Sequence, residues 1–210
     1  MAQTEQKNQN VKKQFEELQS LLERAMALQT SMVLFEWDDE TLAPKGAAEH
    51  TARVIGSLSE QYQEILASMR FKELLDVCQK AEKENAGVFD EVQSAILREA
   101  AEEQERLSCI PPEEYRAYAE LTARATGIWT RAREKNDFAS FAPVLKEIIS
   151  YQKKFAAYRA KPGQKLYDVM LDTYEKGFNM EMLDPFFELM KGKICLLYTS
   201  PSPRDMRRSR

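Results

Sequence analysis

The chain has 210 residues, of which 43% are hydrophobic and 30% are charged, and its formal net charge is -4. This composition is typical of a soluble globular protein, and no stretch approaches the roughly 20 consecutive apolar residues that a membrane-spanning helix needs. Because His50 is the single histidine, the chain by itself cannot form a His-rich zinc site or a facial triad with two histidines.

The residue composition favours helices, and the cysteine content is typical of a reducing compartment. The 7 glycines and 8 prolines are few, which favours helices over hairpin turns. The three cysteines are an odd number without metal-type spacing, which is typical of a cytoplasmic protein. The first residues are polar and lack an apolar signal segment, so we expect neither secretion nor membrane association.

Apolar residues recur at helical spacing through the first half of the chain. The first helical run covers about residues 8–37, after which Pro44 and Gly46 break the helix. Three more runs follow at about 47–69, 71–84 and 88–107. The stripe of the first run consists of Val11, Phe15, Leu18, Leu22, Ala25 and Met32.

The second half continues this pattern. Pro111-Pro112-Glu113-Glu114 begins a fifth helix, because proline suits the first turn and acids suit the positive end of the helix dipole. A sixth run covers about 138–160, and a short segment, Lys165–Tyr174, follows it. A last helix is expected to begin at Asp184-Pro185 with Asp184 as its cap. No segment predicts a strand, so we expect an all-α protein of six or seven helices.

Residues 195–210 differ in character from the rest of the chain. They carry a net charge of +3 and no helical period, so the body, residues 1–194, carries -7. A disordered basic tail that contacts nucleic acid or an acidic partner is one interpretation. The eleven residues from Cys195 to Asp205 also resemble the translation of a transposase adapter used in DNA library preparation. We therefore expect 195–210 to be a non-native tail without a role in function.

Few residues of the body suggest chemistry. His50 has no second ligand at helical spacing, which favours a surface or packing histidine. The acids that follow Trp37 (Asp38, Asp39 and Glu40) could bind a cation or line a polar groove, but a solvated helix end is the default for such a run. Cys78 and Cys109 are expected to be buried small apolar residues.

Nucleic-acid binding is not expected. A charge of -7 on the body opposes the phosphate backbone, which must be neutralised by lysine and arginine. Several aromatic residues could be read as a binding platform, but their helical spacing favours core packing. These residues are Tyr115, Tyr118, Trp129, Phe138 and Phe141.

Three strings, in this order, resemble signatures of the carboxypeptidase Taq family of metallopeptidases. The first is Glu36-Trp37-Asp38 with Thr41, Pro44, Gly46 and Arg53. The second is Trp129-x-x-Ala132-Arg133-x-x-Asn136-Asp137-Phe138-x-x-Phe141-x-Pro143-x-Leu145. The third is Tyr167-Asp168-x-x-Leu171-Asp172-x-Tyr174-Glu175-x-Gly177. The resemblance covers most of the body up to Ile194.

The resemblance implies an all-helical zincin-like fold with a deep groove between two helical halves. It implies a hydrolase that removes single residues from peptide C-termini, usually as a cytosolic homodimer. In the family, a His-Glu-x-x-His helix and a later glutamate hold zinc, or cobalt in some members, and the motif glutamate acts as general base on the metal-bound water.

This chain lacks the His-Glu-x-x-His motif. We therefore expect residues 1–194 to be the N-terminal helical part of a zinc-dependent metallocarboxypeptidase, without catalytic or metal-ligating residues of its own. No substrate-binding residue is assigned, although the stretch from Trp37 to Pro44 could approach the groove. The chain alone is expected to bind no metal and to be inactive. A non-enzymatic helical protein-interaction module is the alternative.

Overall fold

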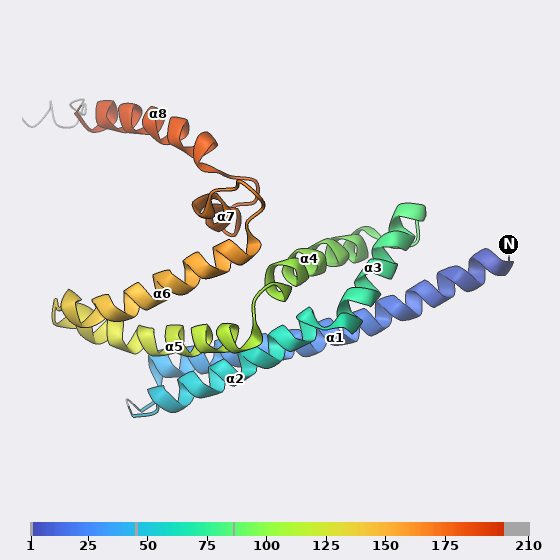
Figure 1. Cartoon of the computed structure of the whole chain (residues 1–210), viewed down its shortest axis with the longest axis horizontal. Helices are drawn as coiled ribbons and strands as arrows, with labels where there is room; N and C mark the ends of the chain where they lie inside the picture. The colour runs from blue at the N-terminus through green and yellow to red at the C-terminus, as the bar shows by residue number, and fades with distance from the viewer. Residues whose placement is uncertain (1, 45, 86, 200–210) are drawn as a thin grey trace, which may run out of the picture. The chain divides into compact units, whose positions relative to one another are not determined.

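The computed structural model describes residues 2–44, 46–85 and 87–199, and within these residues it contains eight helices and no strand (Figure 1). The all-α prediction is therefore confirmed, with one helix more than expected. The additional helix forms in the short segment after residue 165. The helices are α1 (Ala2–Thr41), α2 (Ala48–Ala67), α3 (Met69–Glu84), α4 (Glu91–Ser108), α5 (Pro112–Glu134), α6 (Phe138–Arg159), α7 (Leu166–Asp172) and α8 (Met180–Thr199).

Local capping decides several helix boundaries. Ser68 ends α2 and caps α3, because its Oγ accepts a hydrogen bond from the backbone N–H of Phe71 at 3.2 Å. Asp90 and Gln93 form a capping box at the start of α4, with N···O distances of 2.8 and 3.1 Å. The fourth helix therefore begins at Glu91 rather than at Val88, which is buried ahead of it.

The last helix begins earlier than the sequence suggested. Asn179 caps α8, because its Oδ1 accepts a hydrogen bond from the N–H of Met182 at 3.0 Å. The prediction that Asp184 caps this helix is therefore wrong, and Pro185 lies inside the helix. The same helix extends to Thr199, so the first five residues of the expected non-helical tail are helical. The remainder of that tail, 200–210, lies outside the described residues.

The chain divides into two compact units, Met1–Phe155 and Ala156–Arg210. In the first unit, α2 packs against both α1 and α5, and α3 packs against α1 and α4 (Figure 1). The main core of this unit lies between the N-terminal half of α1 and the helices α3 and α4. Its buried residues include Phe15, Leu18, Phe71, Leu74 and Leu97.

The apolar stripe of α1 is buried only along its first half. Val11, Phe15, Leu18 and Ala25 are buried as expected, whereas Met32 is half-buried. Beyond this point α1 exposes apolar side chains, among them Val33, Leu34 and Trp37. None of the helices in the described ranges is long and apolar enough to cross a membrane.

A buried glutamine joins α2 to the end of α4. Gln63 is fully buried, and its Nε2 donates to the carbonyl oxygens of Leu107 at 3.1 Å and Ile110 at 2.6 Å. The last carbonyls of a helix lack partners within the helix. The Leu107 carbonyl also accepts from the N–H of Ile110 at 3.1 Å, so Gln63 adds a second hydrogen bond there and supplies a donor to the Ile110 carbonyl in the turn after α4.

Candidate functional site

A pocket of about 260 Å³ lies where α1, α2 and α5 meet in the first unit. The last turns of α1 bring three carboxylates to it, α2 and α5 bring three threonines, and four apolar side chains complete the lining. The carboxylates are Glu36, Asp39 and Glu40, the threonines are Thr51, Thr122 and Thr126, and the apolar residues are Ala48, Ala52, Ile55 and Ala123.

Apart from the Thr51 hydroxyl, which can donate or accept, the polar lining of this pocket consists of hydrogen-bond acceptors. Thr122 Oγ1 donates its proton to the backbone oxygen of Ala119 at 3.0 Å, and Thr126 Oγ1 donates to that of Thr122 at 3.4 Å. Their remaining lone pairs can only accept, and ionised carboxylates also only accept. None of the described residues that line the pocket is lysine or arginine. The lining is thus complementary to a group that donates hydrogen bonds and not to an anion.

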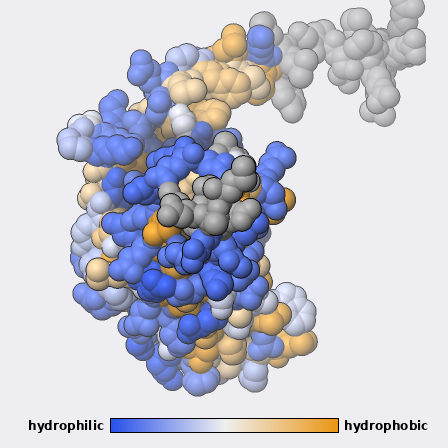
Figure 2. Space-filling model, turned by 90° about the vertical axis from the view of Figure 1, so that its right-hand side faces the viewer, coloured by the Kyte–Doolittle hydropathy of each residue, from blue (hydrophilic) through white to orange (hydrophobic). Residues whose placement is uncertain are grey.

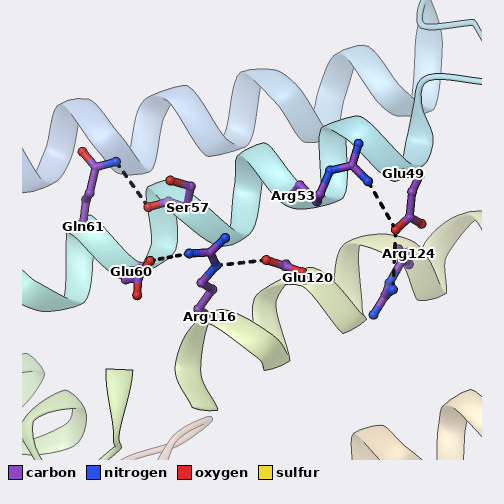
Figure 3. Close-up of polar contacts among 8 residues, drawn as sticks. All are labelled: Glu49, Arg53, Ser57, Glu60, Gln61, Arg116, Glu120 and Arg124. Atoms are coloured by element: carbon purple, nitrogen blue, oxygen red, sulfur yellow. Dashed lines mark hydrogen bonds and ion pairs between the residues drawn. The ribbon is translucent and has the colours of Figure 1, made fainter. Parts of the chain in front are cut away.

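Two groups of ion pairs join α2 to α5 in the same unit (Figure 3). Arg116 of α5 contacts Glu60 of α2 at 2.9 Å and Glu120 of its own helix at 3.0 Å, and hydrogen bonds to Glu120 and Glu60 raise the pKa of the Arg116 guanidinium. Glu49 of α2 lies 3.6 Å from Arg124 of α5. Exposed ion pairs of this kind contribute little to stability, so they align the helices more than they stabilise them.

The predicted acidic cluster divides at the end of α1. Asp39 and Glu40 line the pocket, whereas Asp38 is exposed and does not line it, and Trp37 is 58% exposed. His50 is exposed in the first turn of α2, at the surface as predicted. Within the described part of the chain, no three His, Cys, Asp or Glu side chains are grouped so that they could hold a metal ion.

The expectation of core packing holds for only part of the aromatic set. Tyr118 packs against Tyr151 and Phe155 with ring centroids 5.7 and 5.3 Å apart. Trp129 is 44% exposed and Phe138 is 67% exposed, so the expectation of burial is wrong for these two. Helical spacing places them on a face of their helices, but no described element covers that face fully.

Of the cysteines expected to be buried, Cys78 is buried and Cys109 is only half-buried. Burial raises the pKa of the Cys78 thiol to about 11, which leaves little thiolate near neutral pH. Cys109 Sγ lies 3.5 Å from the backbone oxygen of Arg106 at the end of α4. Neither geometry indicates an activated nucleophile.

Two of the three signature strings build turns. In the second string, Asn136 adopts a φ of 52°, and Asp137 accepts a hydrogen bond from the N–H of Ser140 at 3.2 Å at the start of α6. In the third string, Asp168 Oδ1 accepts from the N–H of Met180 at 2.9 Å and so fixes the start of α8 relative to α7. These residues position helices and do not converge on the pocket.

The threonines of the pocket were missed by the sequence analysis. Thr51, Thr122 and Thr126 lie on two helices that are far apart in the chain, and each has an ordinary helical environment in the sequence. No local signal distinguishes them from surface threonines. Only the first signature string, which contains Glu36, overlaps the pocket lining.

Comparison with known proteins gives a consistent result. The model of the carboxypeptidase Taq (M32) metallopeptidase family matches residues 17–209. Carboxypeptidase 1 of Bacillus subtilis is 34% identical over 177 residues, which are 84% of this chain and 34% of that protein. Thermostable carboxypeptidase 1 of Thermus thermophilus is 31% identical over 191 residues, which are 85% of this chain and 37% of that protein.

Solved structures agree with the sequence matches. The crystal structure of BsuCP superposes with a TM-score of 0.80 at 32% identity and covers 86% of this chain and 35% of that chain. The structure of Pyrococcus furiosus carboxypeptidase gives a TM-score of 0.68 at 29% identity and covers 88% of this chain and 36% of that chain. The chain spans about a third of the length of the curated relatives it matches. On this evidence, the chain belongs to the carboxypeptidase Taq (M32) family of metallopeptidases.

Proposed function

We propose that this chain is the N-terminal part of a zinc-dependent metallocarboxypeptidase that removes residues from the C-termini of peptides. The observation that carries the proposal is the family match over residues 17–209. The named relatives, which are carboxypeptidases, support the reaction class. By the same resemblance, the whole protein is proposed to be a cytosolic homodimer.

The sequence lacks the His-Glu-x-x-His motif that the family resemblance implies for the metal site. His50 is exposed, and no group of three potential ligands lies near it or elsewhere in the described part of the chain. The zinc ligands are therefore proposed to lie in the part of the relatives that this chain does not match. Zinc, when bound there, would lower the pKa of a bound water toward neutrality.

Two features of the described helices fit a supporting role. The ion pairs at Arg116 and Glu49 join α2 to α5, and the capping contacts at Asp137 and Asp168 fix the starts of α6 and α8. These contacts orient the helices relative to one another. We propose that the helices form one wall of the substrate groove, and that the chain alone is inactive.

The experiment is to read the genomic DNA past the codon for Ile194 and to assay the product. A His-Glu-x-x-His codon series in the same frame, and chelator-sensitive release of C-terminal residues by the longer product, are expected. The same read tests the proposal that 195–210 derive from an adapter, since native DNA would then encode other residues. A native stop codon after position 210 would overturn the peptidase proposal and favour an interaction module.

A direct test uses the 210-residue chain itself. Metal analysis after purification at neutral pH should find less than stoichiometric zinc, and the chain should release no residue from peptide substrates. One tightly bound zinc ion per chain would contradict the proposed location of the metal site. The cysteines provide an internal control, because blocking them with an alkylating reagent should leave the zinc content unchanged.

A further inference from the structure

We draw no further inference here: the strongest candidate, the exposed apolar side chains along α8 in the second unit (Figure 2), carries none, because nothing in the described part of the chain shows what covers them.

Discussion

Gly56 of α2 lies close to Glu120 of α5, and replacing it tests how tightly these helices pack. A Cβ atom at this position would lie 2.2 Å from Cγ, 2.8 Å from Oε1 and 3.0 Å from Cδ of Glu120. Atoms do not approach so closely, so Gly56→Ala must displace the Glu120 side chain or separate the helices. Because the nearest atom is Cγ, which is close to the backbone of α5, a rotation of the carboxylate alone does not relieve the clash.

Two opposing effects set the expected change in stability. Alanine is favoured over glycine inside a helix by about 0.5–1 kcal/mol. Overpacking of a well-packed site costs about 1–3 kcal/mol, and moving Glu120 also disturbs its 3.0 Å contact with Arg116. We therefore expect Gly56→Ala to lower the free energy of unfolding by about 1–2 kcal/mol. In a Glu120→Ala background the clashing atoms are gone, and the same change should raise it by about 0.5–1 kcal/mol.

The assay is urea denaturation of the four proteins of this double-mutant cycle, followed by circular dichroism at low protein concentration. A coupling energy of about 1.5–3 kcal/mol and a reversal of sign are expected. Glu120→Gln is the control, because it keeps the volume and removes the charge, and Gly56→Ala should remain destabilising there. An equal effect of Gly56→Ala with and without the Glu120 side chain would refute the close approach of the two helices.

Three further predictions concern single residues. Gln63→Leu should lower the free energy of unfolding by about 1–3 kcal/mol, because the Ile110 carbonyl oxygen loses its Gln63 donor, whereas Leu107 keeps its hydrogen bond from the N–H of Ile110; an unchanged urea midpoint would contradict this. At pH 8, a disulfide reagent should modify exposed Cys195 and leave Cys78 unmodified until the chain unfolds, because burial raises the pKa of Cys78 to about 11. The hydrogen bond from Ser140 lowers the pKa of Asp137, so the ionised carboxylate should stabilise the fold above about pH 4, and this stabilisation should fade as the pH falls. Urea midpoints measured across this pH range should show the loss in the wild type and not in Asp137→Asn.

The sequence by itself determined the all-α class and most helix positions, because helical spacing and caps are properties of neighbouring residues. Val11, Phe15 and Leu18 were assigned correctly to a buried stripe, because the spacing of apolar residues along a single helix is enough to predict that they share one face. The predicted start of α8 was wrong because it also relied on neighbouring residues alone. Asp184-Pro185 is a strong local start signal, but Asn179 supplies the cap five residues earlier, and the helix continues through Asp184 and Pro185.

Only the tertiary structure decided which parts of a helix face are covered. Trp129 and Phe138 have the same apolar spacing as buried residues, yet they are exposed, because spacing describes one helix and burial depends on what lies against it. The pocket likewise depends on how the helices pack against one another. Glu40 on α1, Thr51 on α2 and Thr122 on α5 meet only because α2 packs between α1 and α5, and long-range packing of this kind leaves no trace in the local residue pattern.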